Sequence, residues 1–176
     1  MNAKGIDVSH YNGPITNLLK QVDFVIAKSS QGSFVDSKYA TFAAQTLKAG
    51  KVLGAYHFAT YGPGTTRQAQ TMLSVARTAA FLVLDVEGEA LRFPKVMRGI
   101  IANLHKLDTQ KRWVGLYASD GNWPGDLGQD FDWPAHWDHE PRRPWRFWQT
   151  QGHPLDLDQY NGDVAHLRAW SKNRRS

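Results

Sequence analysis

The chain lacks cysteine altogether, and that absence removes several classes of protein at once. Without thiols it has no disulfide framework, no thiolate nucleophile and no cysteine-ligated metal centre. No apolar stretch approaches the roughly 18 residues that a membrane-spanning helix needs. The opening residues, MNAKGIDVSHYNG, also lack the charged, apolar and small-residue regions of a secretory signal. We therefore expect a protein that is made in the cytoplasm without a signal peptide and has no transmembrane segment.

Acidic residues are outnumbered, since 16 Asp and Glu face 21 Lys and Arg and the net charge is +5. Such an excess favours a polyanionic partner: a nucleic acid, an acidic membrane or an anionic envelope polymer. The sequence contains no glycine-rich phosphate loop, zinc-finger spacing or other recognition motif. We therefore expect no nucleic-acid partner and favour electrostatic contact with anionic envelope polymers.

Strand-like and helical patterns alternate along the first two thirds of the chain. The strand-like runs are residues 5–9, 23–29, 52–59, 80–87, 112–119, 145–151 and 155–161. Helical apolar spacing predicts helices over residues 37–50, 65–79 and 93–108. This alternation predicts a parallel sheet covered by helices, because parallel neighbours need a crossover.

After residue 119 the pattern changes to short aromatic runs and turns with no evident helix. A complete eightfold barrel commonly needs about 250 residues, and this chain has 176. We therefore predict an α/β fold: one domain over residues 1–176 that forms an irregular, helix-poor (β/α) barrel of TIM-like type.

The run FLVLDVEG, residues 81–88, ends a buried strand with two acids, Asp85 and Glu87. Residues i and i+2 of a strand share a face, so these carboxyls project together from the carboxyl end, where barrels carry their active sites. Two like charges this close favour one protonated and one ionised acid, which is what glycoside hydrolysis requires. The alternative is that both acids are solvated or paired with a cation.

Further acids and aromatic residues occur near the ends of other strand-like runs. Asp7 lies in GIDVSHYNG, and Asp156 and Asp158 lie in LDLDQYNGD. We expect these acids to converge on the mouth of the barrel. Aromatic faces beside carboxylates commonly hold sugar rings, although most aromatic residues belong to ordinary cores. The aromatic candidates are Tyr56, Phe58, Tyr117, Trp123 and Trp148.

These motifs together resemble a known family. The segments GIDVSHYNG, FVIAKSSQG, LGAYHFA, FLVLDVEG, GLYAS, FWQTQG and LDLDQYNGD occur in the order seen in glycoside hydrolase family 25, the lysozymes of the Chalaropsis type. The resemblance covers nearly the whole chain. It implies hydrolysis of the β-1,4 bond between N-acetylmuramic acid and N-acetylglucosamine in peptidoglycan, without a metal or other cofactor. The length and the missing leader favour a phage endolysin that acts on the cell wall after release.

The resemblance also implies roles for particular residues. Glu87 resembles the general acid, and Asp85 resembles a partner that orients the substrate's 2-acetamido group or serves as base. Asp7 and Asp156 resemble outer acids of the same catalytic cleft. The residues that resemble the lining of the sugar site are Tyr56, Tyr117, Trp148 and Gln149. Retention, inversion and substrate assistance remain open, and we favour assistance by the acetamido group.

The chain departs from the family pattern at two positions. Gln31 stands where the family often has glutamate, and Asp158 stands where it usually has asparagine, which we expect to add negative charge at the rim. No cell-wall-binding repeat follows the catalytic part, so we predict no separate binding domain. We expect a monomer.

In HWDHE, His136, His139 and Glu140 lack the spacing of a zinc motif, so we expect a polar loop and no metal site. We expect His57 to pack in an apolar strand with one nitrogen hydrogen-bonded.

The main alternative to a muramidase is a non-catalytic carbohydrate-binding protein on the same barrel. A hydrolase of another N-acetylated glycan is the third possibility.

Overall fold

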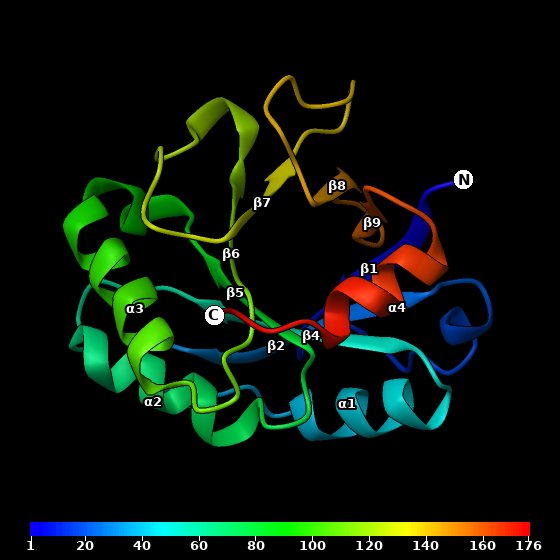
Figure 1. Ribbon diagram of the computed structural model, residues 1–176, viewed down its shortest axis with the longest axis horizontal. Coiled ribbons are helices and arrows are strands. Elements are labelled where there is room, and N and C mark those ends of the chain that lie inside the picture. The colour runs from blue at the N-terminus through cyan, green and yellow to red at the C-terminus, as the bar shows by residue number, and fades with distance from the viewer.

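Eight strands close into a barrel in the computed structural model, which describes residues 1–176 (Figure 1). The strands are β1 (Ala3–Val8), β2 (Phe24–Gln31), β3 (Phe34–Val35), β4 (Val52–Phe58), β5 (Phe81–Asp85), β6 (Val114–Ser119), β7 (Phe131–Ala135), β8 (Phe147–Gln151) and β9 (Leu157–Tyr160). Their order is β1-β9-β8-β7-β6-β5-β4-β2, and a β1–β2 pairing closes the ring. The short β3 forms a hairpin with β2 outside the ring. The predicted irregular α/β barrel is confirmed.

The sequence predicted a parallel sheet, but one strand of the barrel is antiparallel to its neighbours. Strand β9 runs antiparallel to both of its neighbours, β1 and β8, while the other neighbours in the ring are parallel. Only the short segment 152–156 connects β8 to β9. A link of this length cannot carry the chain back to start a parallel strand, so β9 reverses direction.

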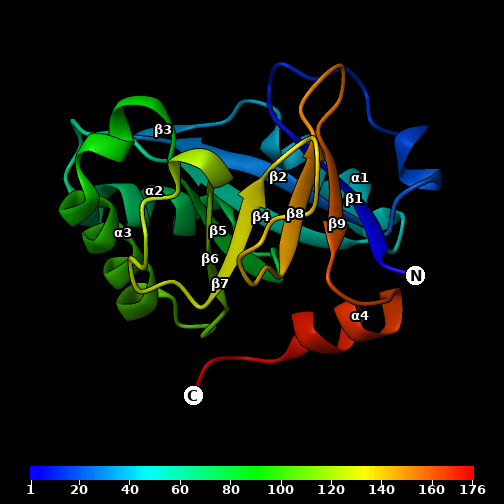
Figure 2. The ribbon, with the colours of Figure 1, turned by 90° about the horizontal axis from the view of Figure 1, so that it is seen from above.

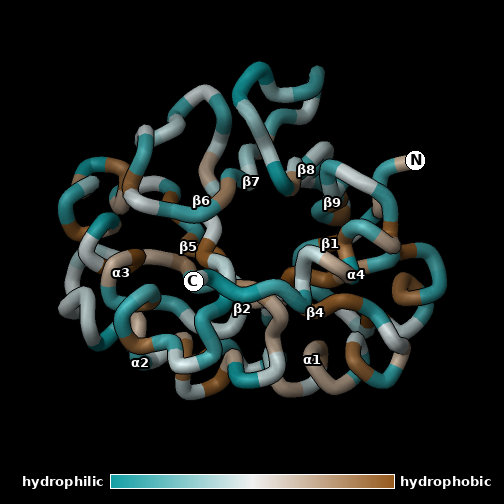
Figure 3. The backbone as a smooth tube through the Cα atoms, viewed as in Figure 1, coloured by the Kyte–Doolittle hydropathy of each residue, from teal (hydrophilic) through white to brown (hydrophobic).

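The helices are α1 (Tyr39–Lys48), α2 (Thr65–Val75), α3 (Pro94–Leu107) and α4 (Val164–Lys172), with short 3₁₀ turns η1 (Leu18–Lys20), η2 (Gly88–Arg92) and η3 (Asp120–Asn122). The first three helices confirm the sequence prediction. Their apolar sides pack on the outer faces of the strands, and Figure 3 shows apolar and polar segments alternating along them. No helix has the length and apolar character needed to cross a bilayer.

The sequence prediction missed α4, β7 and the two-residue β3. Helix α4 begins after Asp163, whose side chain accepts a hydrogen bond from the His166 amide at 2.8 Å, a capping signal that was present in the sequence. Strand β7 contains Pro134, which argues against a strand in sequence-based reasoning. Leu167 and Trp170 of α4 pack against aromatic rings at the amino end of the barrel, opposite the loops that follow the strands (Figure 2). Helix α4 therefore closes the floor of the barrel.

Glycine in one strand makes room for phenylalanine in the next at three places inside the barrel. A Cβ atom on Gly5, Gly54 or Gly115 would lie 2.2 to 2.4 Å from the ring of a neighbouring phenylalanine. The three facing phenylalanines are Phe24, Phe81 and Phe131. Large and small residues thus alternate around the lower interior of the barrel and fill it with side chains.

Replacing Gly115 by alanine should lower the free energy of unfolding by about 1–3 kcal/mol, because its Cβ would overlap the buried Phe131 ring. Urea unfolding of the two proteins measures the difference. Gly121→Ala is the matched control, since no atom lies within 4 Å of the added Cβ. Equal losses in both variants would contradict the packing argument.

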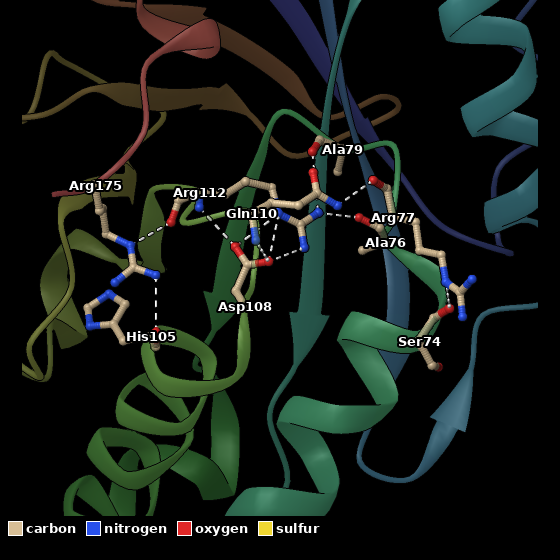
Figure 4. A network of polar contacts seen from close by, with 9 residues as sticks. All are labelled: Ser74, Ala76, Arg77, Ala79, His105, Asp108, Gln110, Arg112 and Arg175. Carbon is tan, nitrogen blue, oxygen red and sulfur yellow. Dashed lines mark hydrogen bonds and ion pairs between the residues drawn. The ribbon is translucent and has the colours of Figure 1, made fainter.

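A buried ion pair joins the loops at the amino end of the barrel (Figure 4). The Arg112 guanidinium donates to Asp108 through Nη2 at 2.8 Å and Nε at 3.1 Å, and both side chains are 2% exposed. Arg112 Nη1 also donates to the carbonyl oxygens of Ala76 and Ala79. The pair therefore ties the segment after α2 to the segment between α3 and β6.

Candidate active site

A cavity of about 300 Å³ opens at the carboxyl ends of the parallel strands. Its lining consists of Asp7, Ser9, Tyr11, Lys28, Tyr56, Phe58, Asp85, Glu87, Tyr117, Trp133, Trp137, Gln149, Gly152 and Asp156. All four acids predicted as site residues are among them. Of the six predicted aromatic and amide contacts, Tyr56, Phe58, Tyr117 and Gln149 line the cavity.

Strand β5 delivers the two central acids. Asp85 is its last residue, and Glu87 follows in extended conformation with φ −134° and ψ 168°. The side chains therefore keep the two-residue alternation, so that Val86 between them is buried in the outer core. Gly88, at φ +52°, then turns the chain into η2, a conformation that favours glycine.

The outer acids reach the same cavity from strands that run in opposite directions. Asp7 lies near the carboxyl end of β1, whereas Asp156 immediately precedes β9. Because β9 is antiparallel to β1, its beginning lies beside the end of β1. The sequence predicted that both acids would meet at the mouth, but it treated β9 as a parallel strand.

Hydrogen bonds connect three of the lining residues in a chain. The Tyr117 hydroxyl donates to Gln149 Oε1 at 3.0 Å, and Gln149 Nε2 donates to Asp7 Oδ2 at 2.8 Å. Gln149 Oε1 also accepts a longer hydrogen bond from Trp137 Nε1 at 3.4 Å. These bonds orient the Gln149 amide, so that its NH₂ group faces the acid.

The acids favour their protonated forms because they are buried close to one another. Burial, together with the charge of Asp156, raises the pKa of Asp7 to about 8. Burial and the charges of Glu87 and Asp7 raise the pKa of Asp85 well above its ordinary value. Burial also raises the pKa of Glu87, against the opposing effects of Tyr117 and Lys28. Burial and the charge of Glu87 raise the pKa of Asp156 to about 6.

Lys28 is the one Lys or Arg side chain in the cavity lining, and the sequence analysis did not assign it a role. Its Nζ donates to Gln31 Oε1 at 2.7 Å and lies 4.8 Å from the centre of the Phe58 ring. Gln31 is neutral, so it leaves the lysine charge free to act on Asp85 and Glu87. The sequence does contain a signal for this position of Lys28. In the strand FVIAKSS side chains alternate between the two faces, so Lys28 shares the face of Phe24 and Ile26, which point into the barrel.

Two predicted sugar contacts, Trp148 and Trp123, lie outside the cavity. Trp148 falls between the inward-facing Phe147 and Gln149, so the pleat of β8 turns its ring outward. Its Nε1 donates to the His136 carbonyl at 2.7 Å. Trp123 packs on the outer core, and the Arg143 guanidinium lies 4.3 Å from its ring centre. The two tryptophans that do line the cavity, the buried Trp133 and the 64% exposed Trp137, were not predicted from the sequence.

The structure also corrects the placement of Asp158. We expected negative charge at the rim, but Asp158 is 2% exposed and does not line the cavity. Burial and the charge of Asp7 raise its pKa well above the ordinary value.

The histidines lie apart from the acids of the cavity. His57 is fully buried and packs as expected, but both of its ring nitrogens are hydrogen-bonded, where we expected one: Nδ1 to Ser30 Oγ at 2.8 Å and Nε2 to Gln68 Oε1 at 3.1 Å. Burial lowers its pKa to about 4, which keeps the ring neutral near pH 7. The structure contains no group of three or more His, Cys, Asp or Glu arranged to hold a metal ion.

A barrel whose mouth carries paired carboxyls, aromatic walls and a sugar-sized cavity has the architecture of a glycoside hydrolase. Residues 6–154 match the family described as Glycosyl hydrolases family 25. This match covers most of the chain, and the protein therefore belongs to that family of glycoside hydrolases.

Individual relatives agree with this placement. Lysozyme M1 of Streptomyces globisporus is 26% identical over 97% of this chain and 71% of its own length. The catalytic domain of an endolysin from a bacteriophage of Listeria monocytogenes superposes with a TM-score of 0.84 and 23% identity, covering 98% of both chains. A bacterial lysozyme from Streptomyces coelicolor superposes with a TM-score of 0.78 and 24% identity, again over 98% of both chains. These structural matches support the fold.

Proposed function

We propose that the protein is an N-acetylmuramidase that hydrolyses the β-1,4 bond between N-acetylmuramic acid and N-acetylglucosamine in peptidoglycan. The observation that carries this proposal is the convergence of Asp7, Asp85, Glu87 and Asp156 on one cavity in a member of glycosyl hydrolases family 25. A protein that only bound carbohydrate would gain nothing from four acids whose burial opposes their ionisation. The name of the relative Lysozyme M1 supports the same activity.

Glu87 is the general acid in this proposal. It is half-buried and therefore accessible to a substrate oxygen, and its raised pKa keeps it protonated at higher pH than an ordinary glutamate. It donates its proton to the glycosidic oxygen as the bond to the anomeric carbon breaks. The departing sugar thus leaves with a neutral hydroxyl.

Asp85 lies deeper than Glu87 and faces the same space. We assign it the task of orienting the 2-acetamido group of the substrate, whose carbonyl oxygen attacks the anomeric carbon. A carboxyl that is buried and has one oxygen without a hydrogen-bond partner is suited to receive the acetamido N–H. Water then opens the resulting ring, with ionised Glu87 as the general base.

The released reducing-end sugar tests the proposal directly. Purified peptidoglycan is digested, the products are reduced with borohydride, and the new ends are identified by mass spectrometry. Muramitol ends are expected from a muramidase. Glucosaminitol ends would identify a glucosaminidase. Digestion of chitin oligosaccharides in preference to peptidoglycan would support the third reading, and binding without any new ends would support the non-catalytic one.

Removing Lys28 should move the alkaline limb of the pH–rate profile to higher pH. The lysine charge lowers the pKa of both Asp85 and Glu87, so Lys28→Met raises both values. A general acid with a higher pKa remains protonated, and active, further into the alkaline range. Clearing rates from pH 4 to 9 give the profile. Lys95→Met, an exposed change at the start of α3, should leave the limb in place.

We further propose that the protein acts on the bacterial wall as an endolysin, in keeping with the endolysin domain whose fold it shares. Its net charge of +5 would draw it to anionic envelope polymers. Salt screens such attraction, with a Debye length of about 10 Å at 0.1 M. Clearing of whole walls should therefore slow as NaCl rises from 0.02 to roughly 0.3 M. Hydrolysis of a neutral soluble oligosaccharide serves as the control and should change little.

A further inference from the structure

Asp158 is a buried carboxyl that lies beneath the proposed active site and has no cation beside it. It projects from β9 into the barrel, is 2% exposed, and does not line the cavity. Its Oδ1 accepts a hydrogen bond from Trp133 Nε1 at 2.9 Å. Its Oδ2 is buried and has no donor facing it. An ionised carboxylate with an unsatisfied buried oxygen is costly, whereas a protonated one needs only an acceptor.

The acceptor is Asp7. In the β1–β9 register Asp158 lies opposite Gly5, which has no side chain, and Asp7 lies two residues further along the same face of β1. The Asp7 and Asp158 carboxyls therefore approach each other closely enough to form a hydrogen bond when one of them is protonated. Two carboxylates cannot form such a bond, so one of the pair must carry a proton. Each carboxyl accepts one hydrogen bond from a neutral donor, Gln149 Nε2 for Asp7 and Trp133 Nε1 for Asp158. Asp7 lines the open cavity whereas Asp158 is sealed beneath it, so a negative charge costs less on Asp7 and Asp158 is the donor.

The charged and polar groups around Asp158 support the same assignment. Acidic groups face it from β1 (Asp7) and from the segment before β9 (Asp156), and both disfavour a further negative charge. Its neighbours on β7 and β8, Trp133 and Gln149, are neutral. Lys28 on β2 is the cation of the cavity, and its charge acts on other carboxyls.

We propose that Asp158 is a positioning residue that remains protonated and donates a hydrogen bond to Asp7, which fixes the Asp7 carboxyl between Asp158 below and the Gln149 amide beside it. Its effect on catalysis passes through Asp7 and rests on the proposed function. The protonation of Asp158 in the folded protein, by contrast, does not depend on what the enzyme cleaves. An asparagine at this position could donate the same bond through its amide, whereas a leucine could not.

The first test needs no enzymatic activity. A folded state that holds Asp158 protonated binds one more proton than the unfolded chain once the pH exceeds the ordinary aspartate value of 3.8. Wild type must therefore lose stability relative to Asp158→Asn as the pH rises, by up to tenfold in the folding equilibrium constant per pH unit. Urea unfolding of both proteins from pH 4 to 8 measures this. A stability difference that does not change with pH would overturn the proposal.

The second test measures cleavage of peptidoglycan by two variants, one that keeps a hydrogen-bond donor at position 158 and one that lacks it. Asp158→Asn should keep kcat within about threefold of wild type, and Asp158→Leu should lower kcat at least tenfold with little change in KM. Circular dichroism and urea unfolding establish that both variants are folded. Equal activity in the two variants would overturn the positioning role, because Asp158 would then only fill space. A wild type that does not cleave peptidoglycan would defeat the proposed function and leave the stability test intact.

Discussion

Glu87→Gln should clear peptidoglycan roughly 10² to 10⁴ times more slowly than wild type, the usual contribution of a general acid. Glutamine keeps the shape of the side chain but has no proton to give to the glycosidic oxygen. The loss should appear in kcat, since the amide can still occupy the same place against the sugar. Turbidity of purified walls and release of reducing ends measure it.

Glu89→Gln supplies the matched control for this result. Glu89 lies two residues further on in η2, is exposed, and does not line the cavity. The same chemical change there should leave the clearing rate within about twofold of wild type, because surface substitutions rarely alter a distant site. Undiminished clearing by Glu87→Gln would remove Glu87 from the catalytic role.

Arg112→Met should cost about 3–5 kcal/mol of folding free energy, because it leaves the Asp108 carboxylate buried without its partner. Arg112 also donates to the Ala76 and Ala79 carbonyls, which would lose those bonds. Chemical denaturation at pH 7 gives the difference. The exposed Arg98→Met variant should change stability by less than about 1 kcal/mol.

The double variant Arg112→Met with Asp108→Leu separates the charge from the packing. Removing both charges should recover much of the stability, because no unpaired ion remains buried. Lowering the pH should also destabilise the wild-type protein, because protonating Asp108 removes part of the ion pair that Arg112→Met removes. Although burial opposes it, hydrogen bonds and charge from Arg112 hold the pKa of Asp108 below its ordinary value of 3.8. The stabilisation is therefore complete above that value and is lost as the pH falls below it. A double variant as unstable as Arg112→Met would contradict the buried-charge explanation.

Much of the fold could be predicted from local patterns. The helices α1, α2 and α3 follow from apolar spacing, and seven of the strands coincide with apolar or aromatic runs. The pairing of Asp85 with Glu87 on one face follows from the two-residue repeat of an extended chain. These features depend on backbone geometry over a few residues, which the neighbouring amino acids control directly.

The placement of several site residues depends on contacts across the barrel. Trp148 and Gln149 are adjacent in sequence, and the closure of the sheet determines that the amide faces the cavity and the indole faces outward. Asp158 seemed to be a rim residue because its burial depends on Trp133 from β7, which the strand prediction had missed.

Sequence alone therefore established which acids are available and that two of them project together. Only the closed barrel decided that Asp156 joins them from the start of a reversed strand, that Lys28 supplies the local positive charge, and that Asp158 lies below the cavity. The physical reason is that side-chain alternation is a local property of an extended backbone. The direction of a strand, and the face that it turns inward, are set by hydrogen bonds and packing between residues far apart in the chain.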